Sequence, residues 1–320
     1  MKVLVVGGVG YIGGAITDLL LETSHEFRVY DVLLYEESYR KKVDFVYGDI
    51  RDRELLQKNL EWADAVIWLA ALVGDGACAL NPEITTVINQ NSVEWLAKNF
   101  DGRIIFMSTC SVYGAQDGEL DENCGLNPLS VYAVTKREAE KALDKKNSII
   151  FRFGTLFGVG DQFSRIRMDL AVNTLTVRAF CQGQIKVFGG EQFRPMMHVK
   201  DAGRVIIDNL TATHTGIFNV HRQNVRIIDL AYQVRNHFPD VEIEVTPMHF
   251  QDTRNYRVNS DKARNILNFK PQYSIDDGIE EVKELLETHR LKDVENPRYT
   301  NQVYLSMFKT HHFASGEIKK

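Results

Sequence analysis

A tyrosine and a lysine four residues apart are the first residues in this sequence whose types and spacing indicate chemistry. Tyr132 and Lys136 share one face of the helix expected after Asn127-Pro128, and no other Tyr-x-x-x-Lys occurs in the chain. About one such pair is expected by chance in a chain with 12 tyrosines, so the spacing alone proves little. A tyrosine of pKa about 10 is a poor base at neutral pH, and a neighbouring ammonium lowers that pKa. The pair predicts proton transfer by a phenolate.

A hydroxyl-rich turn precedes this helix. Ser108, Thr109 and Ser111 follow an apolar run that reads as a β-strand. A hydroxyl at this position would share a substrate proton with Tyr132. A strand-end turn of serine and threonine is common in proteins without a catalytic role, so that interpretation stays open here.

A glycine loop joins the first expected strand to the first expected helix. Gly7, Gly10 and Gly13 form G-x-x-G-x-x-G, and Gly8 gives G-x-G-x-x-G in the same segment. Phosphate binding needs backbone N–H groups exposed at a helix N-terminus with no Cβ in the way, which glycines supply. The alternative is a tight turn without a ligand.

An acid stands at the end of the second expected strand, 18 residues beyond Gly13. At that position the Asp31 carboxylate can accept both hydroxyls of an adenosine ribose, and it would repel a 2′-phosphate. The alternative is an exposed acid at a strand end. With the glycine loop, Asp31 predicts NAD rather than NADP as the cofactor, and an oxidised nicotinamide would lower the pKa of Tyr132 further.

The first half of the chain alternates short apolar runs with amphipathic segments. Apolar residues recur at helical spacing over residues 12–20, 84–100 and 131–143. Uniformly apolar strands separated by helices indicate a parallel sheet covered on both faces, so we predict a Rossmann-like, doubly wound α/β fold. The expected strands are Lys2 to Val6, Phe27 to Asp31, Val43 to Tyr47, Ala65 to Leu69, Arg103 to Met107 and Ser148 to Phe153.

After residue 154 the pattern becomes less regular. We expect residues 1–160, with a return segment near 196–222, to form the NAD-binding domain, and residues 161–320 to form a smaller α/β substrate-binding lobe at the carboxyl ends of the strands. The tail from about Glu295 is loosely composed. The elements expected in the lobe are helices at Met168 to Gln182, Ile227 to Phe238 and Ile275 to Arg290, and strands at Lys186 to Phe188 and Glu242 to Val245.

Composition excludes several classes of protein. The 320 residues are 44% hydrophobic and 25% charged, with a net charge of −5 and interspersed signs, so neither a disordered chain nor a nucleic-acid partner is indicated. The four cysteines lack the spacing of a disulfide framework or a thiolate zinc site, and no metal site is expected. No apolar run approaches a membrane span or a signal peptide, which favours a cytoplasmic protein.

Several further motifs accompany the glycine loop and the tyrosine–lysine pair in a fixed order. Together they resemble the extended short-chain dehydrogenase/reductases that act on nucleotide sugars, over roughly residues 1–290. These motifs are Gly48-Asp49-Ile50, Leu69-Ala70-Ala71, Asn89, Ser108-Thr109-Cys110-Ser111-Val112-Tyr113-Gly114, the segment Arg152 to Gly158, and Arg194-Pro-Met-Met-His198-Val-Lys-Asp201.

The resemblance implies a role for each matching residue. Thr109 would act with Tyr132 and Lys136 in catalysis. The implied cofactor-binding residues are Gly7, Gly10, Tyr11, Ile12, Gly13, Asp31, Asp49, Ile50, Leu69, Ala70, Ala71, Asn89, Tyr132 and Lys136. The implied substrate-binding residues are Cys110, Ser111, Thr155, Asn173, Val187, Arg194 and Arg254.

Departures from the family pattern narrow the expected reaction. The 4,6-dehydratases carry Asp-Glu directly after the catalytic threonine, whereas this chain has Cys110-Ser111, so no carboxylate is in place to protonate a leaving hydroxyl. Thr155 stands where many relatives have asparagine. The segment from Arg165 to Asn173 resembles a branch that includes 4-epimerases and NAD-dependent nucleotide-sugar 4-dehydrogenases.

The sequence therefore predicts an NAD-dependent nucleotide-sugar epimerase that oxidises a sugar hydroxyl reversibly, at C4. A nucleotide-sugar 4-dehydrogenase or 4-ketoreductase is the alternative within the same chemistry. A non-catalytic NAD-binding sensor or scaffold is the alternative from another class. In relatives the helix with the Tyr-x-x-x-Lys pair and the preceding helix pack against their copies, so a homodimer is expected.

Overall fold

The central element of the fold is a parallel sheet of seven strands. The computed structural model describes residues 1–163, 165–247 and 255–308. The strand order is β11-β7-β5-β4-β1-β2-β3, and every neighbouring pair is parallel. The order reverses between β1 and β4, and open α/β sheets bind ligands in the crevice at that place. The strands are β1 Lys2–Val6, β2 Glu26–Asp31, β3 Asp44–Tyr47, β4 Ala65–Trp68, β5 Arg103–Thr109, β7 Ser148–Phe153 and β11 Gly216–Val220.

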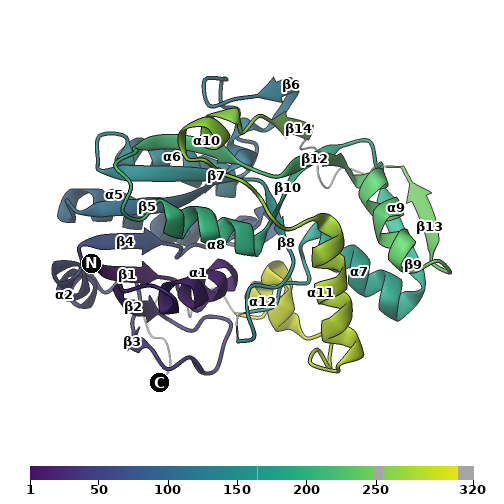
Figure 1. The fold of residues 1–320 in the computed structure, drawn as a ribbon, viewed down its shortest axis with the longest axis horizontal. Coiled ribbons are helices and arrows are strands. Elements are labelled where there is room, and N and C mark those ends of the chain that lie inside the picture. The colour runs from purple at the N-terminus through teal and green to yellow at the C-terminus, as the bar shows by residue number, and fades with distance from the viewer. Residues whose placement is uncertain (164, 248–254, 309–320) are drawn as a thin grey trace.

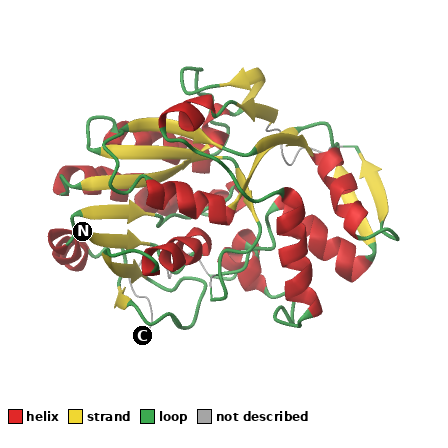
Figure 2. Cartoon of the chain, in the orientation of Figure 1, coloured by secondary structure: helices red, strands yellow, loops and turns green. Residues whose placement is uncertain are grey.

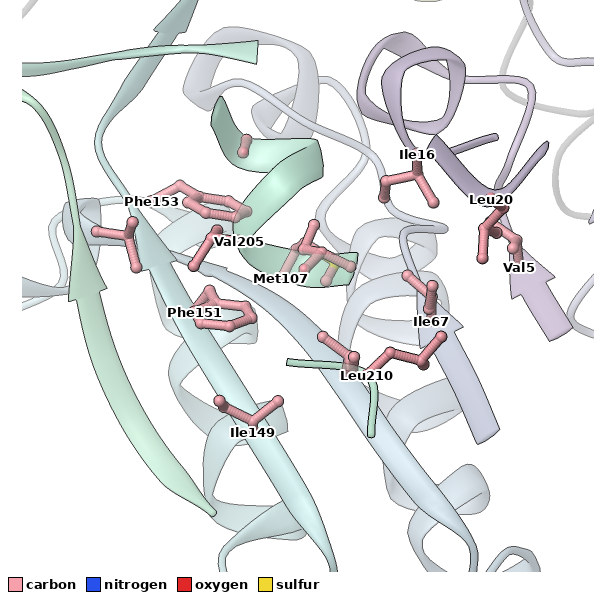
Figure 3. Packing of buried hydrophobic residues seen from close by; sticks show 14 of the residues in the cluster. Val5, Ile16, Leu20, Ile67, Met107, Ile149, Phe151, Phe153, Val205 and Leu210 are labelled. Atoms are coloured by element: carbon pink, nitrogen blue, oxygen red, sulfur yellow. The ribbon is translucent and has the colours of Figure 1, made fainter. Parts of the chain in front are cut away.

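Helices cover both faces of this sheet, and the pleat of each strand decides which face a residue meets. Val3 and Val5 lie in one apolar cluster with helices α1 and α8, whereas Leu4 and Val6 lie in another with α2, α5 and α6. Figure 3 shows part of the first cluster, including Val5, Ile16 and Val205. The helices are α1 Tyr11–Leu21, α2 Arg53–Trp62, α5 Ser92–Asn99, α6 Val131–Leu143 and α8 Val199–Asp208.

The predicted doubly wound fold is confirmed. The strands Lys2–Val6 and Ser148–Phe153 and the helix Val131–Leu143 begin and end where the sequence predicts. The helix expected over 84–100 is interrupted: α4 (Pro82–Thr86) and α5 flank a π-helical turn at Val87–Asn91. A short helix, α3 (Asp75–Ala79), lies in the loop after β4 and was not expected.

A group of helices and short strands lies beside the carboxyl ends of the central strands (Figures 1 and 2). We call this group the lobe; its helices are α7 Ala171–Gln182, α9 Ile227–His237 and α11 Ile275–Glu287, and its parallel strand pair is β9 Gln184–Phe188 with β13 Glu242–Thr246. These five elements pack around one apolar cluster that includes Leu175 and Leu230.

Short strands connect the central sheet to the lobe. The strands β8, β10 and β12 form a three-stranded sheet, and β6 pairs with β14. Their bounds are β6 Ala115–Leu120, β8 Thr155–Phe157, β10 Phe193–His198, β12 Gln223–Arg226 and β14 Asn255–Val258. The remaining helices are α10 Asp261–Ile266 and α12 Asn301–Ser306, with 3-10 turns at Cys110–Tyr113 and Pro297–Tyr299. No helix of the described residues is long and apolar enough to span a bilayer.

The last described residues, 297–308, form what we call the C-terminal segment. The sequence predicts a loosely composed tail here, whereas the structure contains a 3-10 turn followed by α12. Leu305 of α12 is buried in a cluster with Leu72 and Cys78, and the Asn301 amide donates to the Val73 carbonyl at 2.7 Å. This short helix is held by tertiary contacts rather than by its own propensity.

Candidate active site

The glycine loop between β1 and α1 is shaped for close approach of a ligand. Gly7 has φ +83°, which L side chains rarely adopt, and a Cβ there would lie 2.5 Å from the Ala70 nitrogen. A Cβ at Gly13 would lie 2.2 Å from a backbone oxygen of the same loop. Helix α1 begins at Tyr11 after Gly10, which has no side chain to cap the first turn. The N–H groups of that turn are therefore available to an anion such as a cofactor phosphate.

The Asp31 carboxylate is fixed at the end of β2. Its Oδ2 accepts a hydrogen bond from the Val9 N–H at 3.0 Å, and its Oδ1 accepts one from the Leu33 N–H at 2.8 Å. Burial raises the pKa of this carboxyl, whereas the backbone hydrogen bonds oppose that rise. Asp31 also lines the cavity described in the next paragraph. Each carboxylate oxygen has a second lone pair, which can accept a hydrogen bond from a ribose hydroxyl.

A cavity of about 1500 Å³ runs from the glycine loop into the lobe. Most of the residues predicted from the sequence to bind cofactor or substrate, or to act in catalysis, line this cavity. Those that line it are Gly7, Gly10, Tyr11, Ile12, Gly13, Asp31, Asp49, Ile50, Leu69, Ala70, Ala71, Thr109, Ser111, Tyr132, Lys136, Thr155, Val187 and Arg194.

Three predicted site residues lie behind the cavity wall, and one lies outside the described residues. Asn89 exchanges two 2.8 Å hydrogen bonds with the backbone of Leu72 and so fixes the loop after β4. The Asn173 amide bonds the backbone of Gly158, and the Cys110 thiol donates to a backbone carbonyl of β7. None of the three lines the cavity, and each instead bonds the backbone of a neighbouring segment. Arg254 is the residue outside the described ranges.

Tyr132, Thr109 and Lys136 meet at the wall of this cavity. Burial raises the pKa of the Tyr132 phenol well above its ordinary value, and a hydrogen bond with the Thr109 side chain partly opposes that rise. Lys136 donates from Nζ to the Met107 carbonyl at 2.8 Å, and burial lowers its pKa to about 8. The phenol therefore needs further positive charge to work as a base, which an oxidised nicotinamide would supply.

Helix α6 holds Tyr132 and Lys136 against the sheet. Its N-cap, Ser130, accepts from the Ala133 N–H at 3.2 Å and donates its hydroxyl to Asp75 of α3 at 2.7 Å. Glu140, four residues after Lys136 on the same face, forms an ion pair with Arg152 of β7. The helix is thus tied to the sheet at one end and to the loop after β4 at the other.

The far end of the cavity is basic and partly apolar. Arg178, Lys186 and Arg194 line it together with Val187 and Phe188. Arg194 is buried, and its Nη1 donates to the Phe193 carbonyl at 2.7 Å. Guanidinium and ammonium groups around an apolar wall suit a diphosphate with an attached base.

Further residues line the cavity for which no role was predicted from the sequence. Arg165 and Arg167 line the cavity, and so do Asn301 and Tyr304 of the C-terminal segment. Tyr256 lies 3.3 Å, oxygen to oxygen, from the Ser111 hydroxyl. The two arginines are visible in the sequence as an Arg-x-Arg beside an aspartate, but nothing in the composition of the tail indicates that it reaches the cavity.

The chain is similar to known proteins over most of its length. The profile of the NAD dependent epimerase/dehydratase family matches residues 3–220. A putative UDP-glucose 4-epimerase of Methanocaldococcus jannaschii is 27% identical over 304 residues, covering 88% of this chain and 96% of that protein. A UDP-glucose 4-epimerase of Lactobacillus helveticus is 28% identical over 327 residues, covering 87% of this chain and 95% of that protein.

Solved structures share the fold. The UDP-glucose 4-epimerase of Thermotoga maritima with UDP-glucose superposes with a TM-score of 0.79 at 22% identity, covering 90% of this chain and all of that one. MoeE5 in complex with UDP-glucuronic acid and NAD superposes with a TM-score of 0.78 at 21% identity, with the same coverage.

The family profile spans the glycine loop, Asp31, Thr109, Tyr132 and Lys136, so the matched region contains every residue of the predicted catalytic set. NAD is the cofactor of that family, and the glycine cradle and the fixed Asp31 carboxylate fit it. The chain belongs to the NAD-dependent epimerase/dehydratase family, among the extended short-chain dehydrogenase/reductases.

Proposed function

We propose that this protein is a nucleotide-sugar 4-epimerase that uses bound NAD. One observation supports the proposal most: Thr109, Tyr132 and Lys136 line the same cavity as the glycine loop, and the residues directly after Thr109 are Cys110 and Ser111. A protonated Asp or Glu side chain at that place would donate a proton to a leaving hydroxyl. Without it, oxidation and reduction at a ring carbon are the chemistry that remains.

In the proposed reaction Tyr132, as a phenolate, accepts the proton of the sugar C4 hydroxyl. Thr109 is hydrogen-bonded to the Tyr132 phenol and would share its proton. Lys136 lines the same cavity, where its positive charge would stabilise the phenolate. When bound in the glycine cradle, NAD would supply reversible hydride transfer at C4. Tyr132 gives its proton back to the sugar oxygen when the opposite face of C4 is reduced, so no proton or electron pair is left over.

The size of the cavity supports two ligands at once. Ligand pockets are commonly 300–1,000 Å³, and about 1500 Å³ leaves room for a dinucleotide together with a nucleotide sugar. The basic residues Arg178, Lys186 and Arg194 at the far end suit the sugar's diphosphate. Because relatives carry the name UDP-glucose 4-epimerase, a UDP-hexose is the substrate we propose first.

Product analysis tests this proposal. The purified protein is incubated in turn with UDP-, GDP-, dTDP- and CDP-hexoses, and products are identified by mass spectrometry and proton NMR. The 4-epimer of one of them, formed without net production of NADH, is the expected result. Stoichiometric NADH with release of a keto sugar would replace epimerisation by the 4-dehydrogenase or 4-ketoreductase reaction. Absence of turnover on the whole panel, with NAD bound, would favour the sensor or scaffold.

We also propose a homodimer formed through helices α5 and α6. These two helices pack against each other, and Leu129 and Val134 expose large apolar side chains before and within α6. Exposed apolar side chains of this kind gain stability when a second copy of the chain covers them. Sedimentation at micromolar concentration is expected to give a dimer, and a monomer would remove this proposal.

A further inference from the structure

Arg165 and Arg167 bring two positive charges into the cavity wall from the loop before α7. Arg165 is only 5% exposed, and both side chains line the cavity. Arg167 is paired with Asp169, Nε to Oδ1, at 2.9 Å. Asp169 also accepts a hydrogen bond from the Asn301 N–H at 2.9 Å, so this carboxylate is shared between the loop and the C-terminal segment.

Within the described part of the chain, Arg165 makes direct contacts with neutral groups and no ion pair. Its Nη2 donates to the Arg298 carbonyl at 2.7 Å, and its guanidinium lies 3.5 Å over the Tyr35 ring. Its Nε is buried and has no hydrogen-bond partner among the described residues. Burial and the neighbouring charge of Arg167 lower the pKa of Arg165 to about 10, although the charges of Asp169 and Glu36 oppose that fall. A buried cation in these surroundings is costly unless an anion completes them.

The positions of the two arginines indicate which anion this is. Arg167 lies 6.0 Å from the Tyr11 ring at the start of α1, and Tyr35 follows the Asp31 carboxylate by four residues. Both neighbours belong to the part of the cavity formed by the glycine loop and the end of β2. The basic residues for a second diphosphate come from other elements, α7, β9 and β10, further along the lobe.

We propose that Arg165 is a ligand of the cofactor's diphosphate, reaching it from the lobe side while the glycine loop binds it from the sheet side. A diphosphate is a dianion, and a planar guanidinium fork beside backbone N–H groups binds it with charge-assisted hydrogen bonds. The C-terminal segment keeps Arg165 in place through the Arg298 carbonyl, and Asn301 and Tyr304 of this segment line the same cavity. The inference depends on NAD binding and not on which sugar reaction follows.

Calorimetry on Arg165→Met tests the proposal. The apo variant is titrated with NAD, with ADP-ribose, which has the same diphosphate, with adenosine, which has none, and with UDP. We expect the Kd of NAD and of ADP-ribose to rise about 10- to 100-fold, the loss of a hydrogen bond to a charged group. The Kd of adenosine and of UDP is expected to stay unchanged.

Two further variants make the result specific. Arg178→Met removes another cavity-lining guanidinium, and its Kd for NAD should equal that of the wild type. Arg165→Lys keeps the charge without the planar fork, so its Kd for NAD should lie between those of the wild type and Arg165→Met. The melting temperature of apo Arg165→Met shows whether that variant folds. If it does not fold, the Kd of NAD for Arg165→Lys tests the proposal in its place.

Two outcomes would overturn the assignment. An unchanged Kd for NAD in folded Arg165→Met would leave the arginine a structural bridge to residue 298. A weaker Kd for UDP with NAD unaffected would make it a ligand of the substrate diphosphate. Neither outcome depends on turnover, so the assignment can fail while the epimerase proposal holds, and the reverse also applies.

Discussion

Glu140 and Arg152 form an ion pair inside the protein, with Oε2 and Nη2 2.7 Å apart and side chains that are 4% and 3% exposed. The pair is also hydrogen-bonded to its surroundings, since Ser108 donates to Glu140 and Arg152 donates to the Tyr113 hydroxyl. The ion pair ties helix α6, which also carries Lys136, to strand β7. The hydrogen bond from Ser108 ties the same helix to strand β5, which ends at Thr109.

Glu140→Ala should therefore destabilise the fold strongly. It leaves the Arg152 charge buried without its partner, which costs about 3–5 kcal/mol of unfolding free energy. The double variant Glu140→Met with Arg152→Met should lose less, because it buries no unpaired charge. Glu138→Ala, which breaks pairs at the edge of the same helix, should change stability by less than about 1 kcal/mol. Urea unfolding of all three compares them, and an equal loss in the single and double variants would contradict the prediction.

Asp31 is expected to give the protein its preference for NAD. NADP places a phosphate beside the carboxylate that Val9 and Leu33 hold at the end of β2, and the like charges repel. Wild type should bind NAD at least about 100-fold more tightly than NADP, and Asp31→Ser should reduce that ratio to about 10 or less. Calorimetry with both dinucleotides measures it. Asp44→Ser, at the exposed edge of the sheet, is the control and should keep the wild-type ratio.

Tyr132→Phe should keep NAD bound but lose turnover by about 10²–10⁴-fold, the contribution of a positioned acid or base. Thr109→Ala should lose less, because Thr109 supports the proton path without being the base. Steady-state kinetics on the substrate found by the product screen measures both. Tyr232→Phe, on the outer face of α9, should have wild-type kinetics. Wild-type turnover in Tyr132→Phe would exclude the phenolate mechanism and favour the sensor.

Lys136 should lower the stability of the apo protein at neutral pH. Its pKa is about 8 when folded, against 10.5 in the unfolded chain, so between these values the unfolded state binds more protons and stability rises with pH. At pH 7 the penalty is a few kcal/mol. Lys136→Met should therefore unfold at a higher urea concentration than the wild type at pH 7, although it loses activity. The difference should shrink as pH rises from 8 to 10; a constant difference would refute the assignment.

The sequence predicts the parts of this structure whose signal is local. The central strands are continuous apolar runs, and the glycine loop and Asp31 have fixed places relative to the first two strands, so the fold and the NAD site follow from them. The pair Tyr132 and Lys136 needs only helical spacing. All of these residues line one cavity in the structure.

Features that depend on tertiary contacts were not predictable in the same way. Asn89 and Asn173 match family positions, yet their amides bond backbone groups, because a buried loop must satisfy its own N–H and carbonyl groups. Helix α12 has six residues, too few for a recognisable period, and it exists because Leu305 finds a buried cluster. The position of Arg165 against Tyr35 joins segments 130 residues apart in the chain.

The contacts of the C-terminal segment couple the exchange of a bound dinucleotide to local unfolding of that segment. Asn301 donates a hydrogen bond to Val73 in the loop after β4, and Arg298 forms an ion pair with Glu37 in the loop after β2. Residues 297–308 thus connect two loops that follow the carboxyl ends of central strands, and several of them line the cavity. A dinucleotide that enters or leaves past them requires these few contacts to open while the core stays folded. The amide protons of α12 should therefore exchange with deuterium slowly when NAD is bound and quickly when it is absent, whereas those of β1 and β4 exchange at the rate of global unfolding in both states.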